Sequence, residues 1–248
     1  MEENKLCKCP KIGVITPMYN NADTILTAIK SVQNQEAFTK NEPYGITHYI
    51  YDDFSTDNSV GVVVDFIIKN NISNIKIFPN QENKGQSNAR NVLIKKALYQ
   101  GCGIIAFLDA DDSWHSNHLK LNIGKKQFDN CFHYSQPECF QNNQQVWPMN
   151  IPIPKTFDGE QFKYNNFIWI SSVIVDAKLL IGEEFDSSLD SVEDWDFWWR
   201  LYLKSSKMPI NFIDNGTTTV RYNVNPNGQA GKSDKARKLL VERYGFKL

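Results

Sequence analysis

The sequence has no long apolar run. No stretch approaches the roughly 20 consecutive apolar residues that a membrane-spanning helix needs. The first residues, Met1-Glu2-Glu3-Asn4-Lys5, are polar and do not resemble a secretory signal peptide. We therefore expect a cytoplasmic protein.

Excess positive charge and paired cysteines are also absent. The 27 Lys and Arg residues are balanced by 28 Asp and Glu, which gives a net charge of -1 and no strong signal for nucleic-acid binding. The five cysteines are odd in number and fit no zinc-site spacing, so we expect reduced thiols. Cys7 and Cys9 could bind a metal only with ligands from elsewhere.

Apolar and aromatic residues are plentiful enough for a large core. They make up 41% and 12% of the 248 residues, which excludes global disorder and fits one large domain, 1–248. The first half alternates strand and helix patterns, which predicts a parallel sheet with right-handed crossovers. The expected strands are 11–16 (stopped by Pro17), 46–51, 75–78 and 104–108, and the expected helices are 22–33, 59–70 and 85–100.

Carboxylates follow two of these strands. Asp52 and Asp53 come after one strand, and Asp109 and Asp111 come after the buried run 104–108. Ligands of parallel sheets bind beyond the carboxyl ends of the strands, and two carboxylates spaced by two residues on one side attract a cation such as Mg²⁺ or Mn²⁺. Asp is also common in turns and helix caps, so Asp112 could simply precede the helix near Asn117.

The second half is less regular. We expect loops and short strands facing a substrate over 128–163, a strand over 167–175 and a last strand over 212–222. A helix beginning at Glu193 places Trp195, Trp198, Trp199 and Tyr202 on one face, which is typical of core packing. Residues 223–248 read as a flexible basic segment, a solvated face or a contact for anionic lipid.

Several motifs together resemble the ordered signatures of family 2 glycosyltransferases. Each is weak alone, but their order and spacing over residues 11–203 are typical of this family. The resemblance implies a GT-A type α/β fold, with a Rossmann-like nucleotide-sugar-binding half (11–112), a mixed central sheet and a smaller acceptor and catalytic half (113–222). The motifs are Val14-Ile15-Thr16-Pro17-Met18-Tyr19-Asn20, Asp52-Asp53-Phe54-Ser55-Thr56-Asp57, Asn83-Lys84-Gly85 with Ala89-Arg90-Asn91, Phe107-Leu108-Asp109-Ala110-Asp111-Asp112 and Glu193-Asp194-Trp195.

The resemblance also assigns roles to matching residues. Tyr19 would pack on the nucleobase, Asp53 beside Asp52 would accept hydrogen bonds from the base, and Arg90 would contact the nucleotide. Asp109 would reach the ribose or the metal. The full set expected to bind the nucleotide sugar is Pro17, Tyr19, Asp52, Asp53, Gly85, Arg90, Asp109 and Ala110.

The implied reaction is a metal-dependent, inverting transfer of one sugar from a nucleotide-diphosphate sugar, such as a UDP-sugar, to an acceptor hydroxyl in surface glycan biosynthesis. Asp111 would hold Mn²⁺ or Mg²⁺ against the phosphates, and Asp194 would be the general base. Glu193 and Trp195 are candidates for contact with a glycan or lipid-linked acceptor. The basic C-terminal segment would allow peripheral contact with the inner face of the membrane.

The sequence departs from the family pattern in three places. It lacks the Gln-x-x-Arg-Trp motif and the membrane helices of processive relatives, which favours one sugar per encounter. Asn225 stands roughly where many relatives place a histidine near the metal, and Phe54 replaces the usual glycine. The alternatives are a nucleotidyltransferase or other phosphate-handling Asp-x-Asp enzyme, a non-catalytic binder, and transfer to a modified nucleobase or a protein.

Overall fold

The computed structural model describes most of the chain. Cys7, Cys9 and Asn225 lie outside the described residues, so the predictions made for them stay predictions. The described residues are 11–36, 45–123, 129–141, 144–147, 154, 156–189, 191–224 and 234–246. None of the helices within these ranges is long and apolar enough to cross a bilayer.

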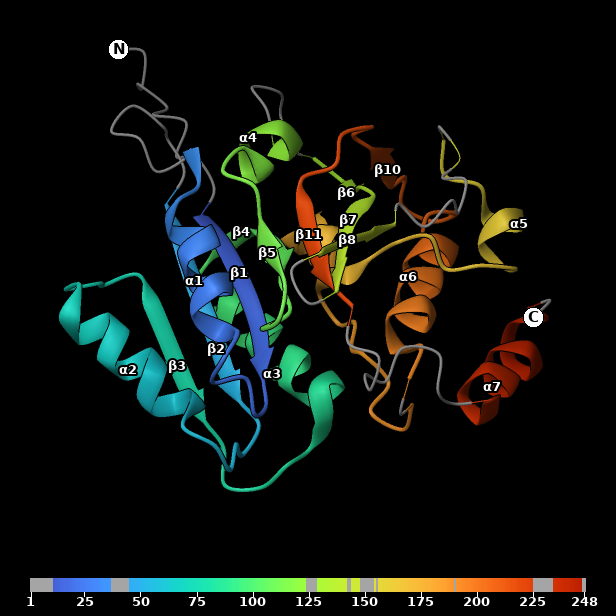
Figure 1. The fold of residues 1–248 in the computed structure, drawn as a ribbon. Coiled ribbons are helices and arrows are strands. Elements are labelled where there is room, and N and C mark those ends of the chain that lie inside the picture. Colours follow the sequence, from blue (N-terminus) through green and yellow to red (C-terminus); the bar gives the residue numbers. More distant parts are fainter. Residues whose placement is uncertain are drawn as a thin grey trace, which may run out of the picture.

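The first half alternates strand and helix, as its apolar pattern predicts (Figure 1). Buried residues recur at helical spacing in the helix α1 and fill nearly all of the central strands. In chain order the elements are β1 (Lys11–Met18), α1 (Ile25–Gln33), β2 (Ile46–Asp52), α2 (Ser59–Lys69), β3 (Ile75–Pro79), α3 (Gly85–Tyr99) and β4 (Cys102–Phe107).

The second half consists of shorter elements joined by longer connections. Its strands have two to five residues, and its longest helix is α6. In chain order the elements are β5 (Ser113–Trp114), α4 (His118–Ile123), β6 (Cys131–Tyr134), β7 (Pro137–Gln141), β8 (Gln144–Trp147), α5 (Gly159–Phe162), the 3-10 helix η2 (Ile170–Ser172), β9 (Ile174–Asp176), the 3-10 helix η3 (Ala177–Leu180), α6 (Glu193–Lys204), β10 (Asn211–Asp214), β11 (Val220–Asn223) and α7 (Asp234–Tyr244).

A mixed seven-stranded sheet runs through both halves. Its strand order is β10-β6-β9-β4-β1-β2-β3, and β1 pairs in parallel with both β2 and β4. Strand β9 lies between β4 and β6 and is antiparallel to both. A smaller sheet, β5-β11-β7-β8, packs beside it. This architecture confirms the predicted mixed α/β fold.

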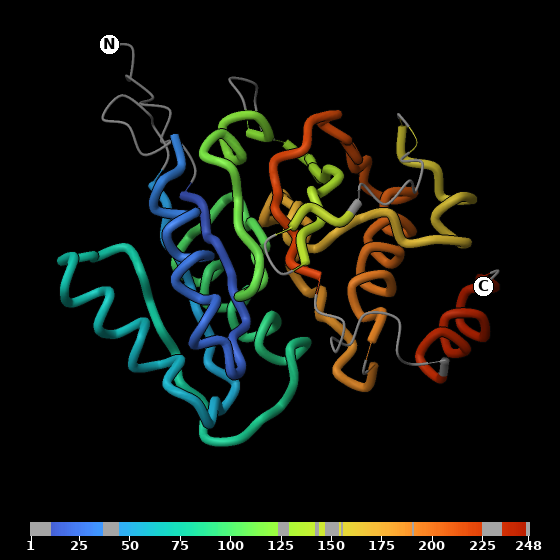
Figure 2. Tube along the Cα trace, viewed as in Figure 1, coloured from blue at the N-terminus to red at the C-terminus, as the bar shows by residue number. Residues whose placement is uncertain are grey.

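Both faces of the central sheet are covered by apolar packing, because successive side chains of each strand point to opposite faces. Ile105 and Phe107 of β4 join one apolar cluster with residues of α3 and α6. Ile104 and Ala106 join another with residues of α1 and of the smaller sheet. Figure 2 shows that the first described element, β1, lies in the central sheet and that the last, α7, lies beyond α6.

Strand β1 continues two residues beyond its predicted end. Pro17 pairs with Tyr51 of β2. The β4 strand accompanies β1 only as far as Ile15, and Met18 turns its carbonyl toward β2, where it accepts a hydrogen bond from the Asp53 amide at 2.8 Å. Because successive residues face opposite edges, the nitrogen of Pro17 faces the edge where β4 has already ended. The missing N–H therefore interrupts no ladder.

Two strands predicted for the second half, 167–175 and 212–222, are wrong because neither range forms one continuous strand. Over 167–175 the chain first forms η2, and only its end enters β9. Over 212–222 the chain forms two strands in different sheets, β10 and β11. A turn at Asn215 and Gly216 separates them, and Gly216 has a φ of 65° that suits glycine.

The basic C-terminal segment contains a docked helix. Helix α7 was expected to belong to a flexible tail, but Ala236, Leu240 and the following Phe246 are buried. Phe246 packs against Trp195 and Trp199 of α6, with ring centroids 5.1 Å apart in both pairs. Apolar contact with α6 thus holds this end of the chain in place.

Candidate active site

The predicted carboxylates lie where the parallel strands end. Asp52 is the last residue of β2, opposite Met18 at the end of β1, and Asp109 follows β4. The backbone N–H of Leu108 donates to Ile15 at 3.1 Å, so the chain leaves β4 beside the end of β1. Both acidic segments therefore meet at one edge of the sheet, as expected for a ligand site of this class.

Asp53 fixes the start of helix α3. Its carboxylate accepts the backbone N–H of Lys84 at 2.9 Å and of Gly85 at 2.7 Å. Gly85 has a φ of 82°, a left-handed conformation that lets the chain turn sharply into the helix. The carboxylate therefore satisfies two N–H groups at the start of the helix, where the backbone has no partner within the helix itself.

A pocket of about 390 Å³ opens above this turn. Tyr19, which is exposed, and Asp53 both line it, and their contacts with a nucleobase stay predictions. Two wall residues, Ser187 and Leu189, come from the second half and were not predicted, because nothing in their sequence suggests a site. The remaining lining residues are Asn83, Lys84, Gly85, Gln86 and Ser87.

The turn after Asp53 is held by short polar side chains. Phe54, at the position where the family resemblance implies glycine, adopts a φ of 68° and leaves its ring exposed. The Asn20 side-chain oxygen accepts the Thr56 N–H at 2.8 Å, and Asp52 accepts the Ser55 N–H at 3.3 Å. These bonds maintain the left-handed turn without the glycine.

Asp112 has a structural role. It is 1% exposed, and it accepts a hydrogen bond from the Ser171 hydroxyl at 2.5 Å and from the Asn223 N–H at 2.9 Å. The same Ser171 hydroxyl accepts the N–H of Asp109 at 3.0 Å. Asp112 thus joins the end of β4 to η2 and β11. Ser171 was not predicted, since its importance arises from contacts distant in sequence.

Asp109 and Asp111 flank a buried alanine. Ala110 packs in an apolar cluster with Met18 and Ile25, so its predicted nucleotide contact would have to use its backbone. Burial, and then the charge of Asp109, raise the pKa of Asp111 to about 6. Within the described residues, no Lys or Arg forms a salt bridge with Asp111. Asp111 therefore lacks the positive partner that its position favours.

Arg90 joins the two halves of the site. Its guanidinium donates to Asp109 at 2.9 Å and to Glu193 at 2.7 Å, while Gln86 donates to the same Glu193 oxygen at 2.7 Å. Burial alone would lower the pKa of Arg90, but the two carboxylates raise it. The Arg90 side chain is 3% exposed, so it holds Asp109 and Glu193 together from inside the protein. Direct contact of Arg90 with a nucleotide stays a prediction.

Asp194 begins helix α6 with a strongly altered acidity. Burial, and then the charge of Glu193, raise its pKa to about 7. Its carboxylate accepts a hydrogen bond from the Asn166 side chain at 3.1 Å and from the Trp195 N–H at 2.7 Å. Asn166 was not predicted. Val192, just before the helix, has a φ of 56°, which a β-branched residue adopts only under strain.

Glu193 and Trp195 face the protein interior. Glu193 is occupied by Arg90 and Gln86, and Trp195 is 4% exposed with its indole N–H bonded to the Phe162 carbonyl at 2.8 Å. Their contact with an acceptor stays a prediction.

The pKa of Tyr222 is affected by acids from both halves of the chain. After burial, the charges of Asp112, Asp109, Asp111 and Asp194 raise the pKa of Tyr222 on β11. The acids that follow β4 and the acid that begins α6 therefore act on the same phenol. The Arg90 bridge links the same segments through bonds, since it joins Asp109 to Glu193, the residue before Asp194. Such an arrangement can accept a proton next to a bound phosphate group.

Comparison with known sequences identifies the family. The sequence profile described as Glycosyl transferase family 2 matches residues 13–174. Over 201 residues the chain is 30% identical to the UDP-Glc:alpha-D-GlcNAc-diphosphoundecaprenol beta-1,3-glucosyltransferase WfgD of Escherichia coli. The aligned region covers 81% of this chain and 73% of WfgD.

Solved structures show the same fold. TarS (residues 1–349) of S. aureus in complex with UDP-GlcNAc matches with a TM-score of 0.65 and 19% identity, over 90% of this chain and 61% of that one. The mannosyltransferase PcManGT of Pyrobaculum calidifontis, in complex with GDP-Man and Mn²⁺, matches with a TM-score of 0.64 and 16% identity, over 88% of this chain and 58% of that one. The present chain thus spans about three fifths of each. With its mixed sheet and its acids at the sheet edge, the chain belongs to glycosyl transferase family 2 and is a glycosyltransferase of the GT-A fold.

Proposed function

We propose that this enzyme transfers one sugar from a UDP-sugar to a hydroxyl of a lipid-linked acceptor, in the synthesis of a surface glycan. The observation that carries the proposal is the link between the Asp53 pocket and the start of α6: Gln86, which lines the pocket, and Arg90 both bond Glu193, the residue before Asp194. The name of WfgD, which includes a UDP-sugar and a diphosphoundecaprenol acceptor, supports the choice of substrates.

The pocket suits the nucleoside part of the sugar donor. Tyr19 offers an exposed aromatic face for stacking, and Asp53 lies at the pocket surface beside the N-terminus of α3. We expect the base near Tyr19 and the diphosphate toward Asp109 and Asp111.

A divalent cation fits the acids after β4. Mg²⁺ and Mn²⁺ commonly bind through one or two carboxylates together with substrate phosphates. Asp111, partly buried and without a cationic partner in the described part of the chain, meets this need, and Asp109 is its neighbour. No group of three or more His, Cys, Asp or Glu side chains in the described residues is placed to hold a metal. When bound, the cation would neutralise the charge that grows on the leaving diphosphate.

Asp194 is the proposed general base. It would take the proton of the acceptor hydroxyl as that oxygen forms a bond to the anomeric carbon, while the bond from this carbon to the diphosphate oxygen breaks and its electrons go to the diphosphate. A single displacement with attack opposite the leaving group inverts the anomeric configuration. A pKa near 7 suits this task, since the carboxylate is available at neutral pH yet basic enough to accept a proton.

The proposed location is the cytoplasm, at or near the inner face of the membrane. Exposed basic residues on α7, namely Lys235, Arg237 and Lys238, offer charge for contact with anionic lipid. Co-sedimentation with vesicles that contain anionic or only neutral lipids tests this contact. Equal sedimentation with both would contradict it.

Transfer can be tested directly with purified enzyme. UDP-Glc, UDP-GlcNAc, UDP-Gal and GDP-Man would each be incubated, with and without Mn²⁺, with a lipid-diphosphate-linked GlcNAc acceptor, and the products analysed by mass spectrometry and NMR. We expect a product one hexose or N-acetylhexosamine heavier from a UDP-sugar, with inverted anomeric configuration. Asp194→Asn should abolish transfer and retain UDP binding, whereas the exposed Asp65→Asn on α2 should retain both. Full transfer by Asp194→Asn would reject the base assignment.

A further inference from the structure

The pocket wall contributed by the second half depends on a short loop, residues 185–189. Ser187 and Leu189 of this loop line the pocket, whereas the other lining residues belong to the first half. The loop leads by a few residues to Asp194 at the start of α6. Its position therefore affects both the width of the pocket and the approach to the proposed base.

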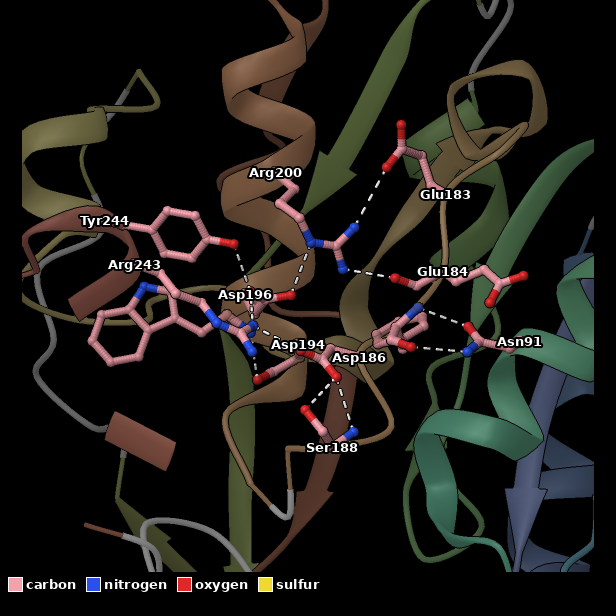
Figure 3. Close-up of polar contacts among 12 residues, drawn as sticks. Asn91, Glu183, Glu184, Asp186, Ser188, Asp194, Asp196, Arg200, Arg243 and Tyr244 are labelled. Carbon is pink, nitrogen blue, oxygen red and sulfur yellow. Dashed lines mark hydrogen bonds and ion pairs between the residues drawn. The ribbon is translucent and has the colours of Figure 1, made fainter. Parts of the chain in front are cut away.

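The start of the loop is held from two helices. Asn91 of α3 bonds both backbone groups of Phe185, accepting its N–H at 2.7 Å and donating to its carbonyl at 2.9 Å. Arg200 of α6 donates to the Glu184 carbonyl at 2.7 Å (Figure 3). These contacts fix the residues before the turn, but they do not reach Ser187 or Leu189.

The turn itself is held by Asp186. Its carboxylate accepts the N–H of Ser188 at 2.9 Å and the Ser188 hydroxyl at 2.6 Å, which closes a tight turn with Ser187 at its tip. The same carboxylate accepts a hydrogen bond at 2.7 Å from the guanidinium of Arg243 on α7. Figure 3 shows Arg243 between Asp186 and α6.

Helix α7 is in turn fixed to α6 close to Asp194. The Tyr244 hydroxyl donates to Asp196 at 2.8 Å, and Arg243 lies 3.5 Å from the same carboxylate. Asp196 is fully buried and also accepts from Arg200 at 2.9 Å. One end of α7 is therefore anchored at the first turn of α6, and from this anchor Arg243 reaches the loop.

We propose that Arg243 is a positioning residue for sugar-donor binding: through Asp186 it holds the 185–189 loop so that Ser187 and Leu189 form the far wall of the nucleotide pocket. The proposal rests on the proposed function of that pocket. Arg243 touches no pocket surface itself and acts only through the loop. The C-terminal helix thereby becomes part of the donor site, in addition to any role at a membrane.

The charge on both partners persists over the working pH range. Burial opposes ionisation of Asp186, but its bonds to Ser188 and Arg243 lower its pKa to about 2. The groups that face Arg243 are Asp186 and Asp196, with Tyr244 beside it. The contact is thus an ion pair at neutral pH, and it should weaken at high salt because both side chains are partly exposed.

The test compares Arg243→Gln with Arg243→Lys, Asp186→Asn and the double variant in the full-length enzyme. Arg237→Gln is a matched control for UDP binding and hydrogen exchange, which do not involve the lipid contact proposed for Arg237, since Arg237 is an exposed arginine on the same helix. UDP binding would be measured by calorimetry, and KM for the sugar donor separately from kcat. We expect Arg243→Gln to weaken UDP binding by about tenfold, the factor that corresponds to ordering one or two side chains, with kcat changed much less. Arg243→Lys should restore most of the loss.

Two results of the binding assays would overturn the proposal. One is UDP binding by Arg243→Gln within twofold of the wild type, and the other is additive losses in the double variant, because partners in one contact should not add. Hydrogen exchange separates this proposal from the proposed function. Amides of the 185–189 loop should exchange faster in Arg243→Gln than in Arg237→Gln even if the wild type binds no UDP, and equal exchange would reject the positioning role.

Discussion

Arg90 offers the sharpest test of how the site is built. In Arg90→Met the methionine fills much of the same space, but Glu193, whose side chain is 7% exposed, loses its cationic partner. Breaking a buried ion pair by removing one partner costs about 3 to 5 kcal/mol, because the remaining charge stays buried. For a chain of this length each kcal/mol lowers the melting temperature by about 2 to 4 °C, so we expect a fall on the order of 10 °C.

The matched variants separate charge from packing. Arg90→Lys keeps the charge but cannot bond Asp109 and Glu193 in the same forked geometry, so an intermediate loss is expected. Arg90→Met with Glu193→Met removes both charges, and it should recover much of the stability lost by the single variant. The exposed Arg237→Met is the control and should change stability by less than about 0.5 kcal/mol.

Urea unfolding followed by tryptophan fluorescence, together with calorimetric melting at pH 7.5, would measure these differences. A loss below about 1 kcal/mol for Arg90→Met would refute the idea of a buried ion pair that joins the two halves, since surface pairs have that magnitude. The idea would also be refuted if the double variant lost more free energy of unfolding than the two single variants lose together.

Four further predictions concern the site. Because the raised pKa of Asp194 is about 7, kcat/KM should fall as the pH drops through 7 and the base takes up a proton, as a pH–rate profile would show. The same shift means that, between the unfolded value of 3.8 and about 7, ionisation favours the unfolded chain, so Asp194→Asn should melt at or above the wild-type temperature at pH 8. Asp53→Asn should weaken UDP binding by about tenfold in calorimetry, because the charged acceptor for the Lys84 and Gly85 N–H groups is lost. Gly85→Ala should cost about 1 to 2 kcal/mol in urea unfolding, because alanine at a φ of 82° is strained although space for its side chain is open.

Each of these predictions has an outcome that contradicts it. A flat pH–rate profile between pH 6 and 8 would argue against Asp194 as the base, and a lower melting temperature for Asp194→Asn would argue against its costly burial. Unchanged UDP affinity in Asp53→Asn would mean that the turn forms without the carboxylate. Gly45→Ala is the control for Gly85→Ala, since Gly45 also has open space and no positive φ, and equal stability of the two variants would remove the conformational argument.

The fold of the first half was predictable because its signals are local. Apolar residues recur at strand or helix spacing, and polar residues interrupt them where elements end, so β1 to β4 and α1 to α3 were placed within a few residues. Pro17 is the instructive exception. Its missing N–H ends a strand only when a neighbour lies on that edge, and the sequence does not show where β4 stops.

The second half was less predictable because its strands are short and pair at long range. β6 has four residues and pairs with β9 and β10, which lie far along the chain. An apolar segment such as 167–175 has the same composition whether it forms a strand or a 3-10 turn. In such segments tertiary contacts decide the local structure.

The acids of the site were predictable from motifs, but their partners were not. Asp53 and Asp194 stand out because a strand ends or a helix begins there. Asn166, Ser171 and Ser187 are ordinary polar residues whose role depends on contacts with residues distant in sequence. The sequence also suggested a nucleotide contact for Arg90, and only the structure reveals that two carboxylates already occupy its guanidinium.

The antiparallel strand β9 has a consequence for how substrates enter. Since β9 is hydrogen-bonded to β4 on one side and to β6 on the other, the backbone itself joins the first half of the chain to the second. The two halves cannot rotate apart about a hinge without breaking the backbone hydrogen bonds between β4 and β9. Opening and closing around substrates must therefore be carried out by surface loops, and heating should melt both halves in a single step.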